Sequence, residues 1–125
     1  MTSDEPLRVL VAENHQGLSD ALSRLIDAEP DMRCVGQVAR AADVLPAARE
    51  AAADALVLDL SLQEGSSLHL IETLSAELPR LRIVVFSGCA ESGELSREVM
   101  RRGAAAFLTK GCEFDVLMNA LRGRA

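Results

Sequence analysis

Five polar residues follow short apolar runs, where their side chains could take part in chemistry. Glu13 and Asn14 follow Val-Leu-Val-Ala, Asp59 follows Leu-Val-Leu, Ser87 follows Val-Val-Phe, and Lys110 follows Phe-Leu-Thr. Carboxylate and amide oxygens suit a hard cation such as Mg²⁺, which takes a carboxylate or two and keeps waters or phosphate oxygens. Aspartate is a competent nucleophile for an acyl phosphate, and Lys110 with a cation could balance the charge of a phosphoryl group on Asp59. These residue types therefore favour phosphoryl transfer, which depends mainly on positioning and charge neutralisation.

The five residues can meet only if the apolar runs are strands of one parallel sheet, because the carboxyl ends of parallel strands share an edge. Apolar runs alternate with helical patterns along the chain. This alternation predicts an α/β domain with a flavodoxin-like (βα)5 arrangement: a doubly wound, five-stranded parallel sheet of order 2-1-3-4-5, in three α/β/α layers. Strands are expected over residues 7–12, 32–38, 55–58, 83–86 and 105–108, and helices over 18–26, 41–53, 68–78, 95–100 and 114–121.

Pro46 lies inside the second of these helices. Proline is tolerated in the first turn of a helix but removes a hydrogen bond further along. We therefore expect this helix to start late or to bend.

Charge and composition argue against nucleic acid as a partner of this domain. Thirteen basic residues stand against nineteen acidic ones, which gives a net charge of −6. Nucleic-acid-binding domains usually present a basic face. Aromatic residues make up 2% of the chain, so it offers few rings on which bases could stack.

The sequence also predicts a cytoplasmic protein that does not enter a membrane. No apolar window approaches the roughly 18 residues that a spanning helix needs. Three widely spaced cysteines, an odd number, form no metal-ligand pattern and fit a reducing compartment. The length of 125 residues allows one domain, with its core over about residues 6–123.

Four segments together resemble the receiver domain of two-component response regulators. They are Arg-Val-Leu-Val-Ala-Glu-Asn-His from Arg8, Leu-Val-Leu-Asp-Leu around Asp59, Val-Val-Phe-Ser-Gly around Ser87, and Gly-Ala-Ala-Ala-Phe-Leu-Thr-Lys from Gly103 to Lys110. Their order and spacing match over essentially the whole chain. The local style is similar to the NarL/FixJ-type group, with an atypical acidic pair.

The resemblance implies a phosphoacceptor and a metal site. Asp59 matches the residue that is phosphorylated. Mg²⁺ would be held by residues that match the family's metal ligands: Glu13, Asn14, Asp59 and the carbonyl of Ser61. The family usually has two aspartates where Glu13 and Asn14 stand, so we expect weaker Mg²⁺ binding, because an amide keeps the oxygen and loses the charge.

The resemblance also implies residues that respond to the phosphoryl group. Ser87 and Lys110 match the residues that contact it, and Phe107 matches an aromatic switch on the last strand. Ser61 and Cys89 fall where the family tunes the lifetime of the phosphoryl group. The loop after Asp59 departs from the family pattern, with Gln63 for Pro and Ser67 for Gly. After Lys110 the family often has Pro or a polar residue, and here it is Gly111.

Two functions remain open at this point. The first is a receiver, phosphorylated on Asp59 by a histidine kinase or phosphotransfer protein, that changes its partners or forms a homodimer through the fourth helix, fifth strand and fifth helix. The alternative is a pseudo-receiver that acts as a protein-interaction module without phosphorylation. Either way we expect a single signalling domain over residues 1–125 with no output domain in this chain, and no enzyme activity beyond self-catalysed phosphoryl transfer and hydrolysis. His15 is expected at the surface or as a helix cap, because no second ligand is near it in sequence.

Overall fold

Strands and helices alternate along the chain, as the hydrophobic pattern predicts. The computed structural model describes residues 5–62, 67–88 and 93–123, and five strands and five helices lie within those ranges. The elements are β1 (Leu7–Ala12), α1 (Gln16–Asp27), β2 (Met32–Val38), α2 (Ala41–Glu50), β3 (Ala55–Leu58), α3 (Ser67–Glu77), β4 (Arg82–Ser87), α4 (Gly93–Arg102), β5 (Ala106–Thr109) and α5 (Phe114–Arg122).

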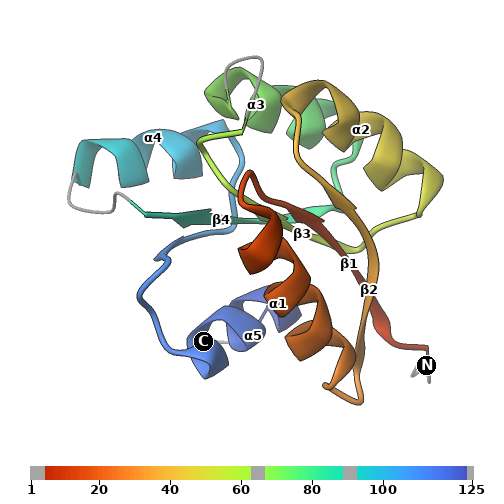
Figure 1. Cartoon of the computed structure of the whole chain (residues 1–125). Coiled ribbons are helices and arrows are strands. Elements are labelled where there is room, and N and C mark those ends of the chain that lie inside the picture. The colour runs from red at the N-terminus through yellow and green to blue at the C-terminus, as the bar shows by residue number, and fades with distance from the viewer. Residues whose placement is uncertain (1–4, 63–66, 89–92, 124–125) are drawn as a thin grey trace.

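The strands form one parallel sheet in the order β2-β1-β3-β4-β5, which confirms the predicted topology. Helices α1 and α5 cover one face, and α2, α3 and α4 cover the other (Figure 1). The β-strand side chains divide between these two layers because successive residues of a strand point to opposite faces. Val9, Val11 and Val57 pack with α1 and α5. Leu10 and Leu56 pack with the other three helices.

The register brings the polar residues after the strands to one edge of the sheet, here called the carboxyl edge. Ala12 pairs with Leu58 across β1 and β3, so Glu13 and Asp59 leave the sheet side by side. The Asp59 N–H donates to the Ala12 carbonyl at 2.9 Å. The Lys110 N–H donates to the Ser87 carbonyl, also at 2.9 Å. These bonds extend the ladder by one step and fix the backbone from which the polar side chains project.

The expectation that the second helix starts late is wrong. Helix α2 begins at Ala41, and Pro46 lies inside it. Burial of Val44 and Ala48 against the sheet favours the helix, at about 1.5–3 kcal/mol for a fully buried Val. Pro46 lacks an N–H for the Ala42 carbonyl, but both residues are exposed, so water can replace the lost bond.

Candidate functional site

A lysine and two carboxylates meet at the carboxyl edge. Glu13 and Asp59 are each only 2% exposed. The Lys110 Nζ donates to Glu13 Oε2 at 3.0 Å and lies 3.4 Å from Asp59 Oδ2. Three strand ends supply these groups, because β1, β3 and β5 stop at the same edge. The structure therefore brings together groups that lie far apart in sequence, as the pattern of apolar runs predicts.

Three donated hydrogen bonds surround the Asp59 carboxylate. The Ser61 N–H and Oγ donate to Oδ1 at 2.9 and 2.8 Å. The Asn14 N–H donates to Oδ2 at 3.2 Å. Burial alone would raise the pKa of Asp59, but the bonds from Ser61 and Asn14 outweigh it and lower the pKa. The carboxylate is therefore ionised and held in one orientation at neutral pH. We call the group of Glu13, Asn14, Asp59, Ser61 and Lys110 the Asp59 site.

The two oxygens of Glu13 have different surroundings. Oε2 accepts the His15 N–H at 3.0 Å as well as the Lys110 ammonium. Oε1 is buried and has no hydrogen-bond partner among the described residues. A buried carboxylate oxygen without a partner costs free energy unless a cation or donor satisfies it. Two buried carboxylates and this unpartnered oxygen fit a divalent cation.

Two further predicted residues, Ser87 and Phe107, lie on the strands β4 and β5. Ser87 is buried at the end of β4, where it pairs with Thr109 of β5. Phe107 is partly buried on β5 and packs against the core under α2, α3 and α4. Cys89 and Gln63 lie outside the described residues.

The ring of His15 contacts the Glu13 carboxylate, a contact that was not predicted from the sequence. It occupies the N-cap position of α1, and its side chain makes no capping bond. Its Nδ1 lies 3.2 Å from Glu13 Oε2, although the side chain is 71% exposed. The signal was its spacing of two residues from Glu13, but only the turn between β1 and α1 aims the ring back at that carboxylate.

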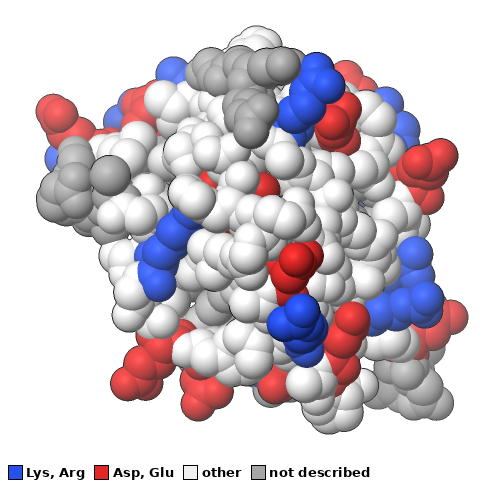
Figure 2. Space-filling view, viewed as in Figure 1, with Lys and Arg blue, Asp and Glu red and all other residues white. Residues whose placement is uncertain are grey.

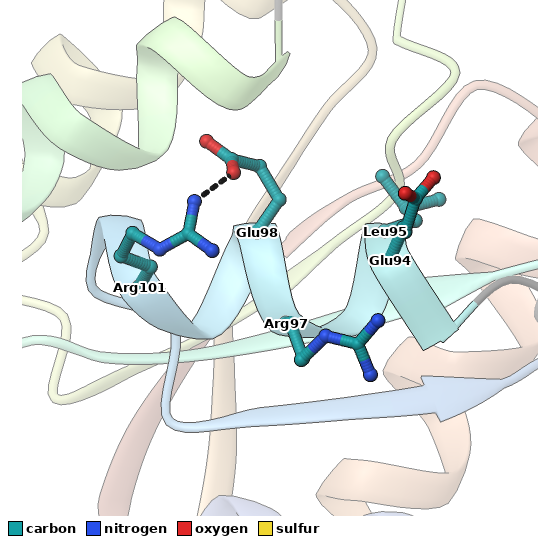
Figure 3. Close-up of a pocket in the computed structure, with 5 residues that line it drawn as sticks. All are labelled: Glu94, Leu95, Arg97, Glu98 and Arg101. Carbon is teal, nitrogen blue, oxygen red and sulfur yellow. Dashed lines mark hydrogen bonds and ion pairs between the residues drawn. The ribbon is translucent and has the colours of Figure 1, made fainter.

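Helix α4 carries a cluster of charged side chains. Figure 3 shows Arg101 and Glu98 pointing toward each other, with Arg97 on another side of the helix. Glu98 also pairs with Arg102 at 2.5 Å, and the hydrogen bond from Arg102 is the main reason that the pKa of Glu98 is lowered. On the face shown in Figure 2, basic side chains lie interspersed with acidic ones rather than gathered in one patch.

None of the helices in the described ranges combines the length and apolar character that a membrane span requires.

The fold and the site define a doubly wound α/β domain with an acidic cluster and a lysine at the carboxyl edge of its sheet. A family model for the response regulator receiver domain matches residues 9–122. The chain belongs to the response regulator receiver domain family.

Particular relatives agree with this assignment. The chain is 28% identical over 125 residues to the nitrate/nitrite response regulator protein NarL of Escherichia coli K12, and the match covers 100% of this chain and 57% of NarL. The chain thus spans just over half of that relative. A two-component response regulator of the LuxR family from Aurantimonas has a TM-score of 0.85 at 21% identity, covering 96% of this chain and 88% of that one. A response regulator from Burkholderia pseudomallei, solved with a phosphorylated aspartic acid, a calcium ion and citrate, has a TM-score of 0.81 at 24% identity, covering 91% of this chain and 65% of that one.

Proposed function

We propose that this chain is a phosphoacceptor receiver whose Asp59 takes a phosphoryl group from a histidine kinase or phosphotransfer protein in the cytoplasm. The observation that carries the proposal is the Asp59 carboxylate itself. It is buried at the carboxyl edge, oriented by three donated hydrogen bonds and flanked by Lys110. The Burkholderia relative, which carries a phosphorylated aspartic acid, supports phosphorylation as the chemistry of this site.

In the proposed reaction, an Asp59 oxygen attacks the phosphorus of the donor. The new bond joins that oxygen to phosphorus, and the bond from phosphorus to the donor breaks, with its electron pair leaving on the donor. The Lys110 ammonium offsets the charge that the phosphoryl group brings, and the Asn14 N–H keeps Oδ2 in place. Glu13, Asn14, Asp59 and the Ser61 carbonyl are the proposed holders of Mg²⁺. When bound, Mg²⁺ would neutralise phosphoryl oxygens.

The response to phosphorylation is proposed at Ser87 and Phe107. A phosphoryl group on Asp59 would attract the Ser87 hydroxyl, and Phe107 would then change its packing on β5. This change would alter the surface formed by α4, β5 and α5, through which the chain would select partners or form a homodimer. Ser61 and Cys89 are proposed to set the lifetime of the phosphoryl group.

Intact-mass analysis after incubation with acetyl phosphate tests this function. We expect one phosphoryl adduct that requires Mg²⁺ and is absent from Asp59→Asn. Asp43→Asn is the matched control, because Asp43 is an exposed carboxylate in the first turn of α2. An adduct that persists in Asp59→Asn would place the modification elsewhere. A folded wild-type protein that forms no adduct would reject phosphorylation by this donor and favour a pseudo-receiver.

A further inference from the structure

We propose that His15 supplies a nitrogen ligand to the metal site beside Asp59, so that the site binds a first-row transition-metal dication more tightly than Mg²⁺. This inference rests on the proposed metal binding at the Asp59 site. It goes beyond that proposal by adding a ligand and changing the preferred class of ion.

The first support is the convergence of three ligand atoms. One atom each from Glu13, His15 and Asp59 lies within 4.8 Å of the others. The two carboxylates are buried, whereas the ring of His15 is 71% exposed and lies at the mouth of the site. The His15 N–H holds Glu13 Oε2 at 3.0 Å, which fixes the backbone that carries the ring.

The second support is the unpartnered oxygen of Glu13. His15 and Lys110 both contact Oε2, and neither contacts Oε1, which is buried. If His15 served only to orient Glu13, the cost of the orphaned oxygen would remain. A cation that bound Glu13 through Oε1 would remove that cost. The unpartnered Oε1 is thus a second observation at Glu13, separate from the clustering of the three residues, and it fits a cation bound to this carboxylate.

The donor set indicates which ion. Carboxylates, carbonyls and water suit Mg²⁺, Ca²⁺ and Mn²⁺, whereas imidazole suits zinc, copper, iron and nickel. Asn14 stands where the family usually has a second aspartate, which removes charge that a hard cation needs. His15 adds a nitrogen at the same turn. Both features shift the preference from Mg²⁺ toward dications later in the first transition row, for which N- and O-donor sites have higher affinity.

The contact between His15 and Glu13 must change when the ring binds a metal. In the contact seen here, Nδ1 must donate to Glu13 Oε2, because an ionised carboxylate only accepts hydrogen bonds. As a ligand, Nδ1 must instead offer its lone pair. The ring is exposed, so its proton can move to Nε2 by exchange with water. The Lys110 ammonium then remains as the donor to Glu13 Oε2.

The test is a titration with Co²⁺, whose visible absorption bands report nitrogen ligation, with Mg²⁺ titrated separately by calorimetry. We expect His15→Gln to weaken Co²⁺ binding by at least about tenfold, since loss of a supporting residue alone costs 10–100-fold. Mg²⁺ affinity should change less than about twofold, because His15 contributes little to a hard cation. His69→Gln is the matched control, because His69 is the other histidine of the chain and lies exposed on α3.

Three outcomes would overturn the proposal: Co²⁺ affinity unchanged in His15→Gln, an equal loss for both metals, or thiolate charge-transfer bands that assign Co²⁺ to a cysteine. NMR of the wild-type protein gives a readout that needs no variant: Zn²⁺ should shift the Nδ1 resonance of His15 and leave His69 in place. The acetyl phosphate assay separates this inference from the proposed function. If the phosphoryl adduct forms with Mg²⁺ but His15→Gln leaves Co²⁺ affinity unchanged, only the metal preference is rejected. Co²⁺ binding through His15 without any adduct rejects only phosphorylation.

Discussion

The two edges of the sheet hold their charged residues in different ways. At the amino edge, where the strands begin, Arg122 at the end of α5 reaches Asp31 at 2.6 Å and also pairs with Glu29. The Arg82 Nε donates to the Ala120 carbonyl. Two arginines thus bind oxygen atoms of neighbouring segments at this edge. Arg122 binds the carboxylates of Glu29 and Asp31, and Arg82 binds the carbonyl of Ala120. They therefore join α5 to the sheet and to the turn before β2.

At the carboxyl edge, buried acidic groups outnumber the basic group that they contact. Two buried carboxylates, Glu13 and Asp59, share Lys110, and one oxygen of Glu13 has no partner in the described part of the chain. Such an arrangement costs stability unless an ion or a phosphoryl group completes it. Functional sites commonly retain this kind of cost while the rest of the fold compensates for it. The comparison therefore assigns stability to the amino edge and ligand binding to the carboxyl edge.

The largest effect is expected from a glycine at the amino edge. Gly103, between α4 and β5, has a φ of +127°, and a Cβ there would lie 2.4 Å from Ser75 Oγ and 2.7 Å from Ser75 Cβ. Gly103→Ala should lower the free energy of unfolding by about 3 kcal/mol, because backbone strain and overpacking add. Gly88 at the carboxyl edge is the control. Among the residues that the structure describes, its Cβ would meet only Lys110 Cδ at 3.9 Å, so Gly88→Ala should change stability by less than about 0.5 kcal/mol. Urea unfolding measures the stability of both variants. Equal losses of stability would contradict the conclusion that the amino edge is the stabilising one.

A smaller effect is expected from the arginine of the amino edge. Arg122→Met should cost about 1–2 kcal/mol, because its charge-assisted bonds are only partly screened by solvent. The hydrogen bond to Asp31 is the main reason that the pKa of Arg122 is raised. A raised pKa means that this stability is present below the unfolded-state pKa and is lost only as pH rises through the folded-state value, so it persists across neutral pH.

Arg49→Met is the matched control for Arg122. The Arg49–Glu77 pair joins α2 to α3, with both side chains more than half exposed, and should contribute less than about 0.5 kcal/mol. Thermal and urea unfolding at low and high salt measure the two variants. If Arg122→Met and Arg49→Met lower the free energy of unfolding equally, the partly buried pairs of Arg122 contribute no more than the exposed pair of Arg49. The proposed stabilising role of the amino edge would then be wrong.

The sequence predicts the sheet and the convergence of Asp59 with Lys110 because both depend on short-range pattern. Fully apolar runs such as Ala55–Leu58 specify strands buried on both faces, and parallel geometry places the next residue at one edge. That α2 runs through Pro46 from its expected start at Ala41 could not be predicted, because burial of Val44 against the sheet is a tertiary effect that outweighs Pro46. Nor could the approach of His15 to Glu13 be read from the sequence, because it depends on the path of the turn after β1.

The smallest effect sharpens the comparison at the carboxyl edge. Asn14→Asp adds a third carboxylate next to Glu13 and Asp59, so without metal the protein should lose about 1 kcal/mol of stability through like-charge repulsion. The same variant should bind Mg²⁺ more tightly, because the added charge restores a ligand that hard cations favour. Bound Mg²⁺ stabilises the folded state, by about 2.7 kcal/mol at 100 times the dissociation constant, so saturating Mg²⁺ should make the variant at least as stable as the wild type. Thermal unfolding with EDTA and then with Mg²⁺ measures this reversal of order. If the variant is less stable than the wild type both with EDTA and with Mg²⁺, residue 14 does not contact the ion. The negative charge that Mg²⁺ neutralises at this edge would then come from Glu13 and Asp59 alone.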